Sequence, residues 1–331
     1  GNPMEMLTAG LRADDVIVRA DAARLLGDLG RKEAVPPLLS YVVECRHCTK
    51  TAGIEALAKI GDRSVCHDLR RIADWPNVPD DWYWFFHRGV RAAACVALLS
   101  LGDDYGAEFL SELADRNHDV FFAWFAPAIL RLKRRSPAVS GLKRRLTVRN
   151  LTGVREGSTR FTNPGTAAMV AEALGIIGTP EARRHLRDLA RAHSRYVRGT
   201  AAAGLLEKEA TAADIRFVAD LAENDPTDFV RIRASAALAR AGVKRWEETL
   251  LRLARSATDP LDLATALESI STLGHSRYLP AVRCYLDHPH PYVRQTCLEA
   301  LDRMGGSVRD ARRGLNDTNE RVRLSAAKFL A

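Results

Sequence analysis

A short pattern recurs along this 331-residue sequence: Val-Arg, then a run of small and aliphatic residues, then Gly. Clear copies are VRADAARLLGDLG, ending at Gly30, and VRQTCLEALDRMG, ending at Gly305. With the weaker copies included, the ends fall at positions 30, 61, 102, 133, 178, 209, 242, 274 and 305. Six of the eight intervals are 31–33 residues long, a period typical of arrays that stack one small structural unit.

Each unit predicts two antiparallel helices. The first is short and amphipathic, as in residues 182–192, and a turn rich in Asp, Asn or Pro follows, as in residues 223–229. The second helix opens with Val-Arg and ends at Gly, which tolerates the left-handed conformation after a helix end. One large aliphatic residue recurs in every second helix as the expected core anchor: Leu26, Leu57, Leu98, Ile129, Leu174, Leu205, Leu238, Ile270 and Leu301.

The pattern resembles the HEAT-like repeat family, in its short form also named after the phycobilisome lyases. The resemblance covers almost the whole chain and rests on the Ala/Leu/Gly spacing that follows Val18-Arg19, Val90-Arg91, Val197-Arg198, Val230-Arg231, Val293-Arg294 and Val322-Arg323. It implies an all-α fold, a right-handed α-solenoid of about ten HEAT-like helical hairpins that forms one domain over residues 1–331. First helices would line the convex face and second helices the concave face.

Composition limits where such a chain can work. Hydrophobic residues make up 47% and charged residues 27%, so the chain can bury a core. The sequence contains no segment of about 18 residues without charge, so no membrane span is expected. The first residues lack a secretory signal. Six Cys without regular spacing are typical of a reducing compartment, so we expect a cytoplasmic protein. The apolar end, KFLA, indicates part of a longer chain or an end that docks on another surface.

Two units are longer than the others, the third with 41 residues and the fifth with 45. The extra residues fall between the first and second helix in both cases, so we expect inserted loops at 73–89 and 146–165 on the same edge of the solenoid. The fourth unit, which they flank, has the irregular second helix DVFFAWFAPAILRLK at 119–133. Pro127 is expected to kink or restart this helix because it lacks an N–H.

Aromatic residues are concentrated in the same region. Residues 75–125, about a sixth of the chain, hold twelve of its 22 aromatic residues. Insertions on one face of a repeat array often form its binding site, so a concave aromatic zone in repeats 3–5 is predicted. The alternative is that the rings fill a local bulge and bury the base of the loop. The candidate binding residues are Trp82, Tyr83, Trp84, Phe86, His87, Phe121, Phe122 and Trp124.

Positive charge is also local. Residues 131–160 hold ten basic residues and one acid, in a chain whose net charge is +8. Such a patch suits phosphates, and neighbouring rings suit bases. The alternative is a solvated outer helix and loop. The candidates are Arg131, Arg144, Arg145, Arg149, Arg155 and Arg160.

The Arg that opens each second helix is expected to be structural. In HEAT-like folds this residue usually pairs with turn Asp residues of the same and neighbouring units. Asp225 and Asp317, six residues before Arg231 and Arg323, are in the right place for such a ladder.

Catalytic and metal signals are weak. The pair Cys45 and Cys48, with His87, has the ligand types for zinc, but thiols without a metal are the simpler interpretation, and we expect no metal and no cofactor. Members of the resembled family that hydroxylate deoxyhypusine use His-Glu pairs to bind iron. No His-Glu dipeptide occurs in this sequence, so that activity is not expected.

The sequence therefore predicts a non-catalytic scaffold that binds a protein partner through the aromatic concave zone. One alternative is a nucleic-acid-binding protein or a HEAT-like DNA glycosylase, which would use the same zone with the patch 131–160 and Glu172 or Asp119 as the catalytic acid. Another is a protein that handles a planar ligand, like the bilin lyases, in an aromatic pocket.

Overall fold

The computed structural model describes residues 2–45, 49–74, 83–115, 120–133, 136–152 and 164–331, and helices form nearly all of its regular structure. The chain divides into two compact units, residues 1–160 and residues 161–330. Each unit is an α-solenoid built from helical hairpins, as the repeat predicts. Among the described helices, none is both long and apolar enough to cross a lipid bilayer.

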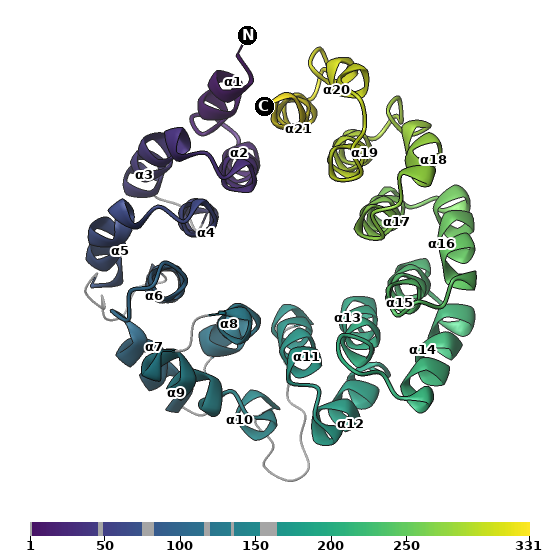
Figure 1. Ribbon diagram of the computed structural model, residues 1–331, viewed down its shortest axis with the longest axis horizontal. Helices are drawn as coiled ribbons and strands as arrows, with labels where there is room; N and C mark the ends of the chain where they lie inside the picture. Colours follow the sequence, from purple (N-terminus) through teal and green to yellow (C-terminus); the bar gives the residue numbers. More distant parts are fainter. Residues whose placement is uncertain (1, 46–48, 75–82, 116–119, 134–135, 153–163) are drawn as a thin grey trace. The chain divides into compact units, whose positions relative to one another are not determined.

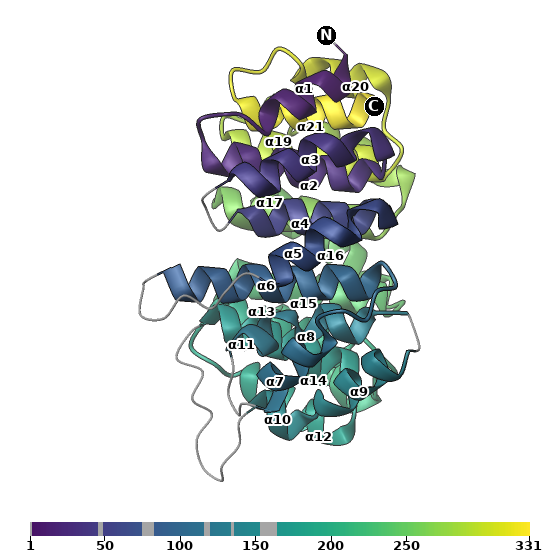
Figure 2. The ribbon, with the colours of Figure 1, turned by 90° about the vertical axis from the view of Figure 1, so that its left-hand side faces the viewer.

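The first unit stacks its hairpins one after another from α1 to α10 (Figure 2). Its second helices, α2, α4, α6 and α8, form an inner layer, and α1, α3, α5, α7 and α9 form an outer layer (Figure 1). The described helices are α1 (Pro3–Gly10), α2 (Val16–Leu29), α3 (Val35–Glu44), α4 (Lys50–Ile60), α5 (Cys66–Ala73), α6 (Tyr83–Ser100), α7 (Ala107–Asp115), α8 (Val120–Arg131), α9 (Pro137–Arg145) and α10 (Val148–Thr152).

The second unit repeats this arrangement, with α11, α13, α15, α17, α19 and α21 in the inner layer (Figure 1). Each inner helix packs on the next inner helix and on the outer helix of its own hairpin. The helices are α11 (Pro164–Ile177), α12 (Pro180–Leu189), α13 (Arg195–Leu205), α14 (Ala212–Asn224), α15 (Asp228–Arg240), α16 (Arg245–Ser256), α17 (Pro260–Thr272), α18 (Leu279–Arg283), α19 (Pro291–Arg303), α20 (Val308–Gly314) and α21 (Glu320–Leu330).

The repeat pattern explains both the helix ends and the core. Gly30 and Gly61 follow α2 and α4 with φ values of 67° and 77°, the left-handed conformation that the pattern predicts. All nine predicted core anchors are almost fully buried, with exposed fractions of 2% or less. Small residues allow close packing of inner helices: a Cβ on Gly175 of α11 would lie 2.7 Å from the Cα of Gly204 of α13.

The predicted insertions are shorter than the sequence suggested. Helix α6 begins at Tyr83, so residues 83–89 of the expected loop 73–89 are helical. Before Gly89 this run contains neither Pro nor Gly, and one Gly inside a helix costs only about 1 kcal/mol. In the expected loop 146–165, α10 spans Val148–Thr152 and α11 begins at Pro164. Residues 75–82 and 153–163 lie outside the described residues.

Pro127 does not end its helix. Helix α8 continues from Val120 to Arg131 with Pro127 inside it. The nearby residues Ala126 and Ile129 are fully buried, and their packing offsets the lost hydrogen bond, which costs about 3 kcal/mol in a helix interior.

Candidate functional site

A groove lies on the inner layer of the first unit, across α4, α6 and α8. Its cavity volume is about 340 Å³. The lining residues are Glu55, Ala58, Lys59, Ala93, Val96, Ala97, Ser100, Phe125, Ala128, Arg131 and Leu132. Most of these side chains are apolar, and three are charged.

The repeat explains why these residues line the groove. On α4 and α6 the positions two before and two after the core anchor line the groove. On α6 these are Val96 and Ser100, around Leu98. Helix α6 contributes only short side chains, whereas α8 contributes the ring of Phe125. The floor of the groove therefore lies over α6, and α4 and α8 form its walls.

The charged groups of the groove come from its two walls. On α4, partial burial raises the pKa of Glu55, while neighbouring Lys59 opposes this shift. The Lys59 Nζ also lies 2.8 Å from a carboxylate oxygen of Asp28, which holds it toward α2. On α8, Arg131 is exposed. The groove thus offers an apolar floor between an acid on one wall and a cation on the other.

The predicted aromatic zone is described only in part. Trp124 on α8 is 45% exposed, unusual for so large an apolar side chain. The residues Tyr83, Trp84, Phe86 and His87 on α6 and Phe121 and Phe122 on α8 have described backbones only, and their side chains lie outside the description. Trp82 is wholly outside the described residues. The aromatic zone therefore remains a prediction, with Trp124 as its described exposed member and Phe125 beside it in the groove.

The predicted basic patch lies mainly in the outer layer. Arg144 and Arg145 are on α9 and Arg149 is on α10, whereas Arg131 ends α8 of the inner layer. The Arg145 Nε donates a hydrogen bond to Asp115 at 3.0 Å, so its charge is partly compensated. Arg144 and Arg149 are exposed. Arg155 and Arg160 lie outside the described residues.

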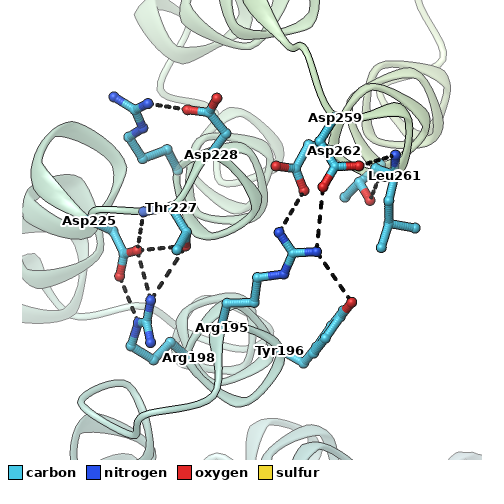
Figure 3. A network of polar contacts seen from close by, with 11 residues as sticks. Arg195, Tyr196, Arg198, Asp225, Thr227, Asp228, Asp259, Leu261 and Asp262 are labelled. Carbon is cyan, nitrogen blue, oxygen red and sulfur yellow. Dashed lines mark hydrogen bonds and ion pairs between the residues drawn. The ribbon is translucent and has the colours of Figure 1, made fainter.

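The predicted arginine ladder is confirmed at two places. Arg198 donates from Nε and Nη2 to both carboxylate oxygens of Asp225 at 2.8 and 3.0 Å (Figure 3). Arg294 makes the same bidentate pair with Asp317, at 2.7 Å for both bonds. Burial would raise the pKa of Asp225, but hydrogen bonds from Arg198 and Thr227 outweigh it and hold this pKa below its usual range. These arginines connect successive hairpins.

A second arginine contact was not anticipated from the sequence. Arg195, which opens α13, forms ion pairs with Asp259 and Asp262 at the start of α17, two repeats further along the chain (Figure 3). Its guanidinium lies over the rings of Tyr196 and Phe229, 5.2 and 5.5 Å from their centroids. Burial raises the pKa of Asp262 despite the neighbouring Arg195. A search within single repeats could not find this contact, because 67 positions separate Arg195 from Asp262.

The catalytic and metal candidates receive no added support. Glu172 lies on α11 of the second unit, and Asp119 is outside the described residues, so their role as a catalytic acid stays a prediction. Within the described part of the chain, no group of three His, Cys, Asp or Glu residues is placed to hold a metal ion. Cys48 falls outside that part.

The fold and the groove define a helical-repeat solenoid protein, a class that uses its extended inner surface for binding. A family model described as HEAT repeats matches residues 4–81 and 215–302, half of the chain. The chain therefore belongs to the HEAT-repeat family. No curated protein matches the sequence.

Two solved structures have similar chains. Human deoxyhypusine hydroxylase in complex with glycerol is 17% identical, with 91% of this chain and 84% of that chain covered and a TM-score of 0.31. The complex of CpcE and CpcF of phycocyanin lyase from Nostoc sp. PCC7120 is 18% identical, with 98% of this chain and 93% of that chain covered and a TM-score of 0.32.

Proposed function

We propose that the protein is a non-catalytic HEAT-repeat scaffold that binds a segment of a protein partner in the groove of α4, α6 and α8. The observation that carries this proposal is the apolar floor of that groove, open on the inner layer and bounded by Phe125. The predicted aromatic zone, of which Trp124 is the described exposed member, is proposed as part of the same binding surface. Exposed aromatic and apolar groups around a hollow are typical of the centres of protein interfaces.

The walls of the groove define the chemistry of the partner. A volume of about 340 Å³ is at the lower end of the range for ligand pockets and admits a few bulky apolar side chains. Glu55 on the α4 wall favours a segment with a basic residue on that side of the groove. An amphipathic helix laid between α4 and α8 would meet these requirements.

A charge placed in the groove tests the proposal. Val96→Glu would put a carboxylate on the apolar floor, and Trp124→Ala would remove the exposed ring. The wild type should capture partner proteins from a native lysate, and we expect both variants to capture at least about tenfold less of them. A tenfold loss of affinity requires a loss of only about 1.4 kcal/mol of binding free energy. Quantitative mass spectrometry of captured proteins provides the measurement.

The matched control is Val43→Glu, which adds the same charge to the outer helix α3 at a side chain that is already 65% exposed. Its captured proteins should match those of the wild type. If the Val96→Glu and Trp124→Ala variants capture the same proteins as the wild type, the groove does not bind a partner.

The basic patch supports a second candidate function, binding to nucleic acid. Arg144 and Arg149 are exposed, and neither makes an ion pair with any residue that the structure describes. A mobility-shift titration with single- and double-stranded DNA and RNA at two salt concentrations distinguishes this function. Nucleic-acid binding would show a steep salt dependence that falls in Arg144→Ala/Arg149→Ala, whereas no binding at low salt excludes this function.

A further inference from the structure

The arginine ladder provides a template for a site elsewhere in the molecule. In both Arg198 and Arg294, Nη1 donates to two backbone carbonyls of the preceding turn, six and five residues earlier. These bonds fix the guanidinium plane. The other edge of the same group, Nε with Nη2, then receives the carboxylate of Asp225 or Asp317. The position of one edge thus determines where an anion binds.

Arg19 of α2 is held in the same way. Its Nη1 donates to the carbonyl oxygens of Ala13 and Asp14, again six and five residues earlier, at 2.5 and 3.0 Å. Across the described residues, Arg19 makes no ion pair. The edge that carries a carboxylate in the other two hairpins has no carboxylate partner among the described residues.

One residue explains why Arg19 lacks the acid that pairs with Arg198. Asp225 follows α14 as its C-cap, with φ −63° and ψ 137°. Cys45 follows α3 as its C-cap in nearly the same conformation, with φ −67° and ψ 125°. The backbones at these two positions correspond, and the first unit has the thiol of Cys45 at the position that Asp225 occupies in the second unit.

Arg19 lines a cavity of about 360 Å³ between the first and second hairpins. Arg12, which is exposed and also makes no ion pair within the described part of the chain, lines the same cavity. Among the residues that the structure describes, the lining consists of Thr8, Leu11, Arg12, Arg19, Pro37, Ser40, Tyr41, Glu44 and Cys45. The related cavity of the second unit is lined by Arg294 together with its own acid, Asp317.

The remaining polar groups of the cavity leave the two guanidinium groups available. The Glu44 carboxylate accepts a hydrogen bond from Ser40 on its own helix at 2.6 Å. The Tyr41 hydroxyl donates to the carbonyl oxygen of Thr49 at 3.1 Å, and burial raises the pKa of Tyr41 to about 12, so this phenol stays neutral. Two cations and one carboxylate give the described part of the lining a net positive charge.

We propose that this cavity binds a small molecule through an oxyanion, a carboxylate or a phosphate group, which takes the place of the missing ladder acid on Arg19, with Arg12 as a second contact. The paired donors of a guanidinium match two oxygens of such a group. This site is independent of the groove on α4, α6 and α8.

The variant Cys45→Asp tests the proposal because it would supply the missing acid from within the chain. Isothermal titration with inorganic phosphate, and separately with succinate, should show saturable binding to the wild type, and the stronger of the two identifies the oxyanion class. We expect Cys45→Asp to weaken that binding by at least about tenfold, since an internal carboxylate competes for Arg19. Its melting temperature without added anion should exceed that of the wild type by a few degrees.

Cys45→Asn is the matched control, because it has nearly the same shape as Asp and no charge, and it should bind the anion as the wild type does. Arg12→Gln, which leaves the ladder intact, should weaken binding severalfold. The proposal is overturned if neither anion binds the wild type saturably, or if Cys45→Asp binds as tightly as the wild type. If circular dichroism shows that Cys45→Asp is unfolded, unchanged binding in Arg12→Gln overturns it instead.

Discussion

At the scale of single residues, arginine has two roles that the sequence pattern does not separate. Arg19 and Arg198 occupy the same position in their repeats, yet of the two only Arg198 contacts an acid within the described part of the chain. The difference arises one hairpin later, at Cys45 and Asp225. Their identities are visible in the sequence, but their equivalence depends on where α3 and α14 end, and a shift of one residue in either helix end would conceal it.

The buried pair of Arg198 and Asp225 makes a prediction about stability. The side chain of Asp225 is 3% exposed and that of Arg198 is 12% exposed. Asp225→Asn should lower the free energy of unfolding by about 3 kcal/mol at pH 7, because it leaves a largely buried guanidinium without its anion. Urea unfolding of both proteins between pH 7 and pH 3 measures the difference.

The pH dependence follows from the lowered pKa of Asp225. A carboxylate with a lower pKa in the folded state contributes stability above its unfolded pKa of about 4, and this contribution is lost as the pH falls through the folded pKa. The difference between wild type and Asp225→Asn should therefore shrink in acid. Asp188→Asn, at a 68% exposed carboxylate, is the control and should change little at any pH. A difference that does not vary with pH would contradict the assigned role of the charge.

At the scale of elements, the repeat predicts the second helices well because the relevant contacts are local and periodic. Gly30 and Gly61 end their helices as expected, and anchors such as Leu57 are buried. The start of α6 is different. The pattern places it at Val90, but the helix begins at Tyr83, because residues 83–88 contain neither Pro nor Gly to interrupt it.

The candidate site is only partly predictable from the sequence, because it depends on which side chains neighbouring helices and repeats bring together. Trp124 and Arg131 were identified by their residue types, and both occur on α8. The hollow at Val96 and Ala97 was not identified, because short side chains on one helix become a groove only when the flanking helices carry longer ones. The contact between Arg195 and Asp262 crosses two repeats, a distance along the chain that no pattern within one repeat encodes.

At the scale of the whole molecule, a repeat array should respond to damage locally. Each hairpin of a solenoid packs mainly on its neighbours, so its stability is set by nearest-neighbour contacts and not by one shared core. In the second unit, one cluster of buried residues runs from Ile232 on α15 to Ala326 on α21. The groove of α4, α6 and α8 and the cavity beside Arg19 lie in the other compact unit.

Leu267→Ala tests this local response. Leu267 on α17 is fully buried in that cluster, and its truncation should cost about 3 kcal/mol through lost burial and the cavity left behind. Hydrogen exchange followed by mass spectrometry should show reduced protection in α15, α17 and α19 and unchanged protection in α2 and α4. Val308→Ala, at a side chain that is 56% exposed, should alter neither region. Equal loss of protection in both units would mean that the chain unfolds as one cooperative body, and binding at α4, α6 and α8 would then depend on residues as distant in sequence as α17.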